Sequence, residues 1–231
     1  MSRQKFLIGA TAALLIPGVE EADARSKIIT KLPASKTKRF AWTIDDGISS
    51  AAVASYLDIA EKGVHHLTLF VTSSYDSWRS NSKQINRLLD AGSIQLGNHT
   101  VRHKDLTTLS TQQVKKELLD CHNFLLNEFD YDARPYFRPP YGISNSKVRS
   151  VAADLGYTVP TMWYGSLGDI FGASDDRIEL FAKKWIADGR ILIDHSNKLK
   201  SKKALVQIQQ TMKSRELQSV TLRDAFGPNF K

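Results

Sequence analysis

Short apolar runs alternate with helical periods along most of this 231-residue chain, and this alternation constrains the fold more than any other feature. Runs rich in β-branched and aromatic residues, such as residues 39–44, 66–72 and 190–194, are typical of buried strands. Between the runs, apolar residues recur at helical spacing and the segments end at glycine. Ser110 and Gln113, for example, form a capping box that begins one helix. About seven such units predict a single α/β domain, a distorted (β/α)7-type barrel of parallel strands covered by helices.

The other expected strands are residues 93–97, 157–163 and 219–222, and the other helices begin at Ser49, Ser82, Asn145, Ser174 and Lys203. The single cysteine, Cys121, excludes an internal disulfide framework. It lies on the apolar stripe of the helix that follows Ser110, so we interpret it as a core residue.

The first 24 residues predict a secretory signal peptide. Arg3 and Lys5 precede an apolar run that is too short to span a membrane, and residues 22–24 form an A-x-A cleavage pattern. Gln4 stands where a twin-arginine signal needs its second arginine, so we favour Sec export, and an uncleaved anchor is the alternative. We therefore expect an exported protein of the periplasm, cell envelope or medium, with no stable membrane span after cleavage.

Residues 25–38 are expected to be a basic linker, because residues 25–39 carry six cations and no acid. Attraction of this segment to an anionic cell-envelope polymer is the functional alternative. Nucleic acid is not an expected partner, since aromatic and basic residues do not interleave. The catalytic domain is then residues 39–226, followed by a tail of residues 227–231.

Two adjacent carboxylates, Asp45 and Asp46, follow the first strand. Alone they indicate a polar turn. In a parallel barrel, however, sites form at the carboxyl ends of the strands. The other polar or aromatic residues expected at such ends are His99, Arg138, Trp163 and His195.

His99 and His103 are four residues apart, so a helical turn would place both imidazoles on one face, as a divalent metal requires. An aspartate at a strand end would complete a set of two histidines and one carboxylate. Such a set leaves coordination positions open for water and substrate.

Four motifs in order, "TIDDG", "HTVRH", "FRPPYG" and "ILIDH", resemble the polysaccharide deacetylase family, also called the NodB-homology or carbohydrate esterase family 4 domain. The resemblance spans about residues 39–226. It implies a distorted barrel of about seven strands and a metal-dependent hydrolase that acts on carbon–nitrogen bonds other than peptide bonds.

The resemblance also implies the metal site and the base. Asp45 would be the general base that takes a proton from the attacking water. Asp46, His99 and His103 would hold one divalent ion, zinc first, with Co²⁺, Ni²⁺ or Mn²⁺ as alternatives.

By the same resemblance, Arg138 pairs with the base, and the backbone N–H of Tyr141 helps to hold the oxyanion. His195 protonates the leaving group, and Asp169 orients His195. The residues expected to bind substrate are Pro140, Tyr141, Trp163 and Ile193, the last against the acetyl methyl group.

One motif departs from the family pattern D-x-x-D-W, which aligns with "SLGDI" at residues 166–170. Asp169 is kept, but Ser166 replaces the first aspartate and Ile170 replaces the tryptophan. Because that tryptophan would line the sugar groove, the departure bears on substrate preference more than on chemistry.

The resemblance therefore predicts removal of acetyl groups, N-acetyl more than O-acetyl, from an acetylated carbohydrate. Peptidoglycan, a chitin-like glycan, an exopolysaccharide and acetylated xylan all stay open as substrates. A non-catalytic carbohydrate-binding protein on the same scaffold and a metal-dependent hydrolase of non-sugar amides are the alternatives.

Overall fold

The computed structural model describes residues 26–62, 65–169, 173–227 and 229–230. The predicted signal peptide, residues 1–24, and Ile170 of the altered motif lie outside the described residues.

The strands are β1 (Arg39–Asp46), β2 (Leu67–Val71), β3 (Ile94–Asn98), β4 (Tyr136–Phe137), β5 (Val159–Pro160), β6 (Gly165–Ser166), β7 (Ile191–His195) and β8 (Gln218–Ser219). The helices are α2 (Ser50–Glu61), α3 (Ser77–Ser80), α4 (Ser82–Asp90), α5 (Thr111–Phe129), α6 (Ser146–Asp154), α7 (Asp175–Trp185), α8 (Lys202–Ser214) and α9 (Leu222–Phe226), with 3₁₀ turns at Leu106–Thr108 and Pro140–Gly142.

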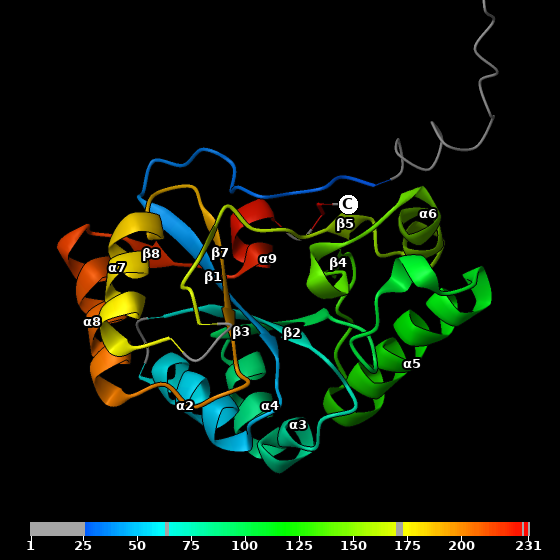
Figure 1. The fold of residues 1–231 in the computed structure, drawn as a ribbon, viewed down its shortest axis with the longest axis horizontal. Coiled ribbons are helices and arrows are strands. Elements are labelled where there is room, and N and C mark those ends of the chain that lie inside the picture. The colour runs from blue at the N-terminus through cyan, green and yellow to red at the C-terminus, as the bar shows by residue number, and fades with distance from the viewer. Residues whose placement is uncertain (1–25, 63–64, 170–172, 228, 231) are drawn as a thin grey trace, which may run out of the picture.

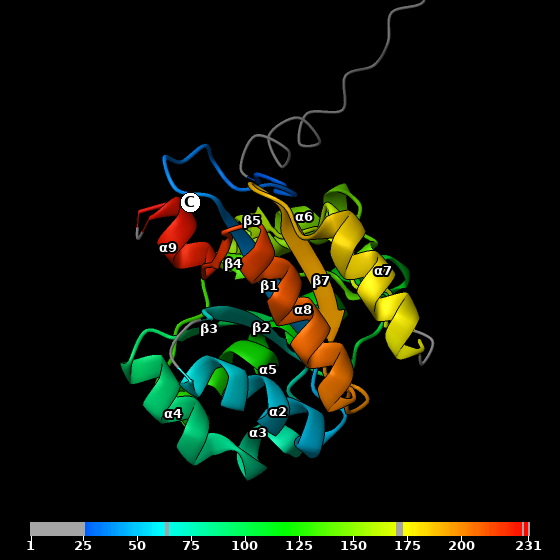
Figure 2. The same cartoon turned by 90° about the vertical axis from the view of Figure 1, so that its left-hand side faces the viewer.

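One parallel sheet forms the centre of the molecule, with strands in the order β5-β4-β3-β2-β1-β7-β6, and β8 pairs with the start of β1. No pairing joins β5 to β6 within the described residues, so the sheet curls into a half-barrel that stays open there. Helices α7 and α8 pack together on one side, α5 and α6 on the other, and α2, α3 and α4 lie across the base of the view (Figure 1). A quarter turn shows α7 and α8 running alongside β7 (Figure 2). The predicted single-domain (β/α)7-type fold is confirmed.

The strand register brings the carboxyl ends of five strands to nearly the same level. Asp46 pairs with Val71, and Val71 with Asn98, which in turn pairs with Phe137. On the other side of β1, Asp45 pairs with His195 at the end of β7. The residues that follow these ends therefore emerge at one rim of the sheet.

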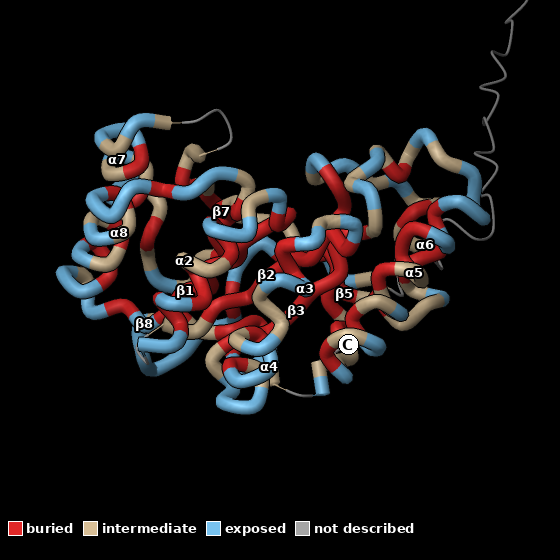
Figure 3. Tube along the Cα trace, turned by 90° about the horizontal axis from the view of Figure 1, so that it is seen from below, coloured by how far each residue is buried: buried red, intermediate tan, exposed pale blue. Residues whose placement is uncertain are grey.

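The central strands are buried along their length: Phe40 to Asp46 of β1 and every residue of β2 and β3 are buried (Figure 3). Such continuous burial is expected of a parallel strand with helices on its outer face. Cys121 is also buried, which confirms its interpretation as a core residue. Within the basic segment ahead of β1, Ile29 and Leu32 are buried against the barrel, and Ile29 bridges to Thr161.

The last predicted strand, residues 219–222, is wrong after its first residue. β8 ends at Ser219, and the Thr221 side chain accepts a hydrogen bond from Asp224 N–H in a capping box that begins α9. The predicted strand at residues 157–163 is reduced to the two residues of β5. β6 was not expected from the sequence.

Gly47 turns the chain away from Asp46 at a φ of 103°, and a Cβ there would collide with the indole ring of Trp78. We expect Gly47→Ala to lower the free energy of unfolding by about 2–5 kcal/mol, from the positive φ and the overpacking together. Gly92→Ala is the control, because its φ is 70° but no atom lies within 4 Å of an added Cβ. Thermal unfolding of both variants measures the difference, and equal melting temperatures would contradict the role assigned to Trp78.

Candidate active site

Three ligand atoms meet at the rim, from Asp46, His99 and His103, and all lie within 4.8 Å of one another. The Nε2 atoms of both histidines are 3.4 Å from Asp46 Oδ1. That oxygen is buried and has no hydrogen-bond partner, while Asp46 Oδ2 accepts a hydrogen bond from Asn197 Nδ2 at 2.5 Å. An unpartnered buried carboxylate oxygen facing two imidazoles fits a cation ligand.

The hydrogen bond of Nδ1 sets the tautomer of His99. His99 Nδ1 lies 2.7 Å from the carbonyl oxygen of Arg138, which can only accept, so Nδ1 carries the proton. The Nε2 lone pair is then free to face Asp46. A backbone carbonyl behind a ligating histidine is the usual support of a metal site.

Electrostatics also suit a cation here. Burial of His103, followed by the nearby His99, lowers the pKa of the His103 imidazole and favours its neutral, ligating form. For Asp46, burial would raise the pKa, but the nearby His99, with Asn197 and His103, outweighs burial and holds the pKa of the carboxyl group well below its usual range. The set therefore combines an ionised carboxylate with an imidazole, that of His103, whose neutral form is favoured.

His99 and His103 do not lie on a helical turn, contrary to the sequence-based expectation. Residues 99–105 form a loop. The buried Glu117 of α5 holds this loop, because its Oε2 accepts hydrogen bonds from the N–H groups of Val101 and Arg102. The two imidazole rings meet edge to face, with centroids 4.9 Å apart.

Asp45 is paired with Arg138, and its other carboxylate oxygen, Oδ2, lies 3.6 Å from His99 Nε2. Arg138, which is completely buried, donates from Nη1 to Asp45 Oδ1 at 2.6 Å. Three of the other four guanidinium N–H groups donate to Thr43 Oγ1 and to the carbonyl oxygens of Thr161 and Met162. A guanidinium held at all three nitrogens fixes the orientation of the Asp45 carboxylate.

His195 and Asp169 form the third part of the rim. Asp169 Oδ1 accepts from His195 Nδ1 at 2.9 Å, and Asp169 Oδ2 accepts from the His195 backbone N–H at 2.8 Å. Burial disfavours the imidazolium, but the hydrogen bond to Asp169 and the charges of Asp45, Asp169 and Asp46 outweigh burial and raise the pKa of His195 to about 9. His195 is thus protonated at neutral pH, with Nε2 left to face a substrate.

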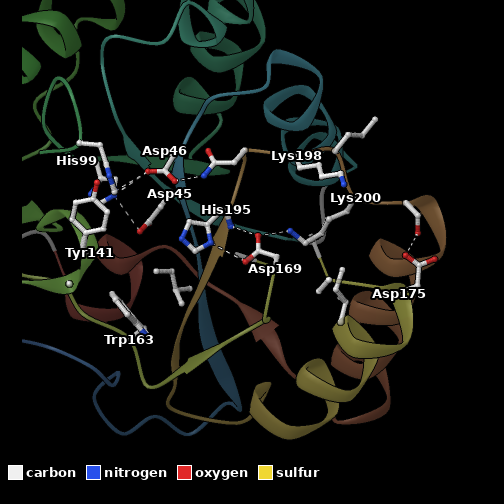
Figure 4. A pocket seen from close by; sticks show the side chains of 18 of the residues that line it. Asp45, Asp46, His99, Tyr141, Trp163, Asp169, Asp175, His195, Lys198 and Lys200 are labelled. Atoms are coloured by element: carbon white, nitrogen blue, oxygen red, sulfur yellow. Dashed lines mark hydrogen bonds and ion pairs between the residues drawn. The ribbon is translucent and has the colours of Figure 1, made fainter. Parts of the chain in front are cut away.

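All three parts open into one pocket of about 630 Å³ (Figure 4). The predicted substrate residues Tyr141, Trp163 and Ile193 line it, whereas Pro140 does not, and the adjacent Pro139 lines the wall instead. The far end of the pocket was not expected from the sequence; its lining includes Ala173, Asp175, Ile178, Lys198, Leu199 and Ser201.

Three site residues adopt a left-handed backbone conformation although none is glycine: Asp46 at φ 76°, His103 at 52° and Tyr141 at 60°. Such conformations are uncommon for residues with a Cβ and gather at functional sites. Nothing in the residue types alone indicates them.

Comparison with known proteins agrees with this geometry. Residues 33–160, more than half of the chain, match the family described as polysaccharide deacetylase. The chain belongs to the polysaccharide deacetylase family.

Among curated relatives of this family member, the peptidoglycan-N-acetylglucosamine deacetylase PgdA of Listeria monocytogenes is 28% identical over 200 residues. The match covers 86% of the chain but only 41% of PgdA. An uncharacterized 30.6 kDa protein of Geobacillus stearothermophilus is 30% identical over 120 residues, and this match covers 52% of the chain and 44% of that protein. The chain therefore spans less than half the length of these two relatives.

Among solved structures, a family 4 carbohydrate esterase from Streptomyces lividans in complex with acetate superposes with a TM-score of 0.66 and 26% identity, over 79% of this chain and 91% of that one. BA3943 of Bacillus anthracis, described as a family pseudoenzyme, shares the fold with a TM-score of 0.73 and 20% identity, over 86% and 68% of the two chains. Because a pseudoenzyme has the same fold, activity must be argued from the site residues.

No helix among the described residues is long and apolar enough to cross a bilayer.

Proposed function

We propose that this chain is a metal-dependent hydrolase that removes acetyl groups, N-acetyl more than O-acetyl, from a carbohydrate polymer or oligomer such as peptidoglycan or a chitin-like glycan. The observation that carries the proposal is the convergence in one pocket of three units with different chemistry. These are a carboxylate paired with arginine, a cation-binding set of two histidines and one aspartate, and a histidine with a raised pKa.

A divalent ion on Asp46, His99 and His103, zinc first with Co²⁺, Ni²⁺ or Mn²⁺ as alternatives, would supply Lewis-acid activation of water near neutral pH. Two imidazoles and one carboxylate suit such borderline ions and leave positions open.

The chain's own residues then divide the proton transfers. Asp45, fixed by Arg138, takes a proton from the water that attacks the acetyl carbonyl. The backbone N–H of Tyr141 donates toward the oxygen that gains negative charge. His195, protonated and held by Asp169, gives its Nε2 proton to the departing nitrogen, so that acetate and a free amine result. Trp163 and Ile193 line the wall against which the acetylated sugar would pack.

Acetate release from N-acetylglucosamine oligomers, with and without a chelator, tests the proposal. Acetate should form in the presence of zinc, stop on chelation and return when zinc is restored. A non-catalytic binding protein would bind the oligomers and release nothing, and a hydrolase of non-sugar amides would act on a simple N-acetyl amide but not on the oligomers.

The raised pKa of His195 predicts a pH dependence. The acid must be protonated, so kcat/KM should fall as pH rises through about 9. Asp169→Asn removes the hydrogen bond and charge that raise the pKa, and this alkaline limb should move to lower pH by about one to three units. Asp175→Asn, which neutralises a carboxylate that contacts Ser201 in the same pocket, is the control and should leave the limb in place. An unmoved limb in Asp169→Asn would remove His195 from the role of acid.

We further propose that residues 1–24 are a signal peptide and that the protein is exported, in support of which stand the two cations, the apolar run and the A-x-A pattern. The exported protein should then begin near Arg25. N-terminal sequencing of protein recovered from the periplasm, cell wall or medium measures this, and a start at Met1 or Ser2 would instead indicate an uncleaved anchor.

A further inference from the structure

Two charged residues beside Asp169 have no part in the proton transfers above, namely Lys200, which lines the pocket, and Asp194, which does not. Lys200 Nζ lies 2.9 Å from Asp169 Oδ2, 2.7 Å from Asp194 Oδ1 and 2.8 Å from the hydroxyl of Tyr56. The Lys200 side chain is 4% exposed and that of Asp194 is completely buried. Figure 4 shows the Lys200 side chain pointing at Asp169, on the side away from His195.

Asp194 is anchored in the core. Its Oδ2 accepts hydrogen bonds from Trp42 Nε1 at 3.1 Å and from the Tyr56 hydroxyl at 2.6 Å. Trp42 lies on β1 and Tyr56 on α2, and both side chains are buried in the core. A chain of contacts therefore runs from the core, through Asp194 and Lys200, to the carboxylate that holds His195.

The charges of the four side chains in this series of contacts cancel. With all groups ionised, His195 and Lys200 are positive, and Asp169 and Asp194 are negative. Burying one member without its partner would leave an uncompensated charge, which is far more costly than burying the pair. Burial and the Asp169 carboxylate raise the pKa of Asp194 to about 7 in spite of Lys200, so Asp194 would bind a proton if Lys200 were absent.

We propose that Lys200 and Asp194 form a buried ion pair that positions Asp169 against His195 and balances its charge. Both are positioning residues, since neither needs to touch the reacting atoms. The inference rests on the proposed role of His195 as the proton donor. The other charged or titratable groups that face His195 are Asp45 and Asp46 from β1 and His103 from the loop after β3.

The proposal makes unequal predictions for the two partners. In Asp194→Asn, Lys200 keeps its proton because Asp169 remains beside it, so one positive charge is uncompensated and the pKa of His195 should fall by about one unit. In Lys200→Met, Asp194 binds a proton in place of the lost cation, so the local charge is kept and the pKa of His195 should not fall.

The double variant Lys200→Met/Asp194→Asn is the decisive one. It has no unpaired charge, and the new amide of residue 194 can donate to Asp169, with which Asp194 already interacts. Adding Lys200→Met to Asp194→Asn should therefore return the alkaline limb of kcat/KM to within about 0.3 unit of wild type. KM for N-acetylglucosamine oligomers should stay within about twofold in Asp194→Asn, because Asp194 does not line the pocket.

The titration of His195 is read directly by NMR of ¹⁵N-histidine in zinc-loaded protein, with its signals assigned by their loss in His195→Ala. The exposed pair Lys203 and Asp176, 3.4 Å apart on α8 and α7, is the matched control, and the same three substitutions there should leave the titration unchanged. An unmoved His195 in Asp194→Asn, or a double variant that stays displaced, would overturn the proposal. If the titration behaves as predicted but no acetate is released, the ion pair stands and the proposed function fails.

Discussion

Asp45→Asn should lower kcat by about 10²–10⁴-fold while the protein keeps its metal. The amide cannot take a proton from water, but it preserves the shape of the side chain and a hydrogen-bond acceptor for Arg138. The three residues that we propose as metal ligands, Asp46, His99 and His103, are not changed. Metal content by mass spectrometry and acetate release from the same sample measure the two properties together.

Asp46→Asn is the matched comparison, one residue away and with the same change of chemistry. It removes the charge from the carboxylate that both imidazoles face, so metal affinity itself should fall. The two variants would then distinguish the proposed base, Asp45, from the proposed metal ligand, Asp46. If Asp45→Asn loses metal as readily as Asp46→Asn, the two roles are wrongly assigned.

His103→Ala should abolish both metal binding and acetate release. It removes one of three protein ligands, and the loss of affinity should exceed the roughly 10–100-fold that removal of an outer partner of a ligand costs. Isothermal titration with zinc after chelator treatment measures the affinity.

His66→Ala is the control for this experiment, because His66 pairs with Asp224 at the opposite end of β2 from the site. It should bind zinc as wild type does. Zinc retained at one ion per chain by dialysed His103→Ala would exclude His103 from the site.

The long apolar strands and the residues at their ends were predictable because both leave a local signal. β1 and β7 are continuous apolar runs, and parallel pairing then makes Asp45 meet His195 without further information. β6 has no such signal. Gly165 and Ser166 have low strand propensity and form a strand because they pair with Leu192 and Ile193 of β7. An added Cβ at Gly165 would lie 2.8 Å from Trp185, so the close packing of α7 accounts for the glycine.

The residues that hold the site residues in place were less predictable from the sequence than the site residues themselves. Asn197 and Lys200 belong to the polar stretch "SNKLKS", which has the composition of a solvent-exposed loop. Their roles arise only when the end of β7 brings that stretch over Asp46 and Asp169. The role of Glu117 was equally hard to predict, because a glutamate on an amphipathic helix normally faces water. In the structure its side chain is 1% exposed and holds the loop before His103.

The left-handed backbone of Asp46, His103 and Tyr141 has a consequence for anyone who engineers this protein for heat resistance. Glycine relieves such a conformation, so a screen for melting temperature alone would reward Tyr141→Gly and its counterparts at the other two positions. Each gain would remove a proposed metal ligand, or the aromatic ring that packs on His103 with centroids 4.5 Å apart. A library selected for thermal tolerance alone would therefore lose the proposed site unless these three codons were held fixed.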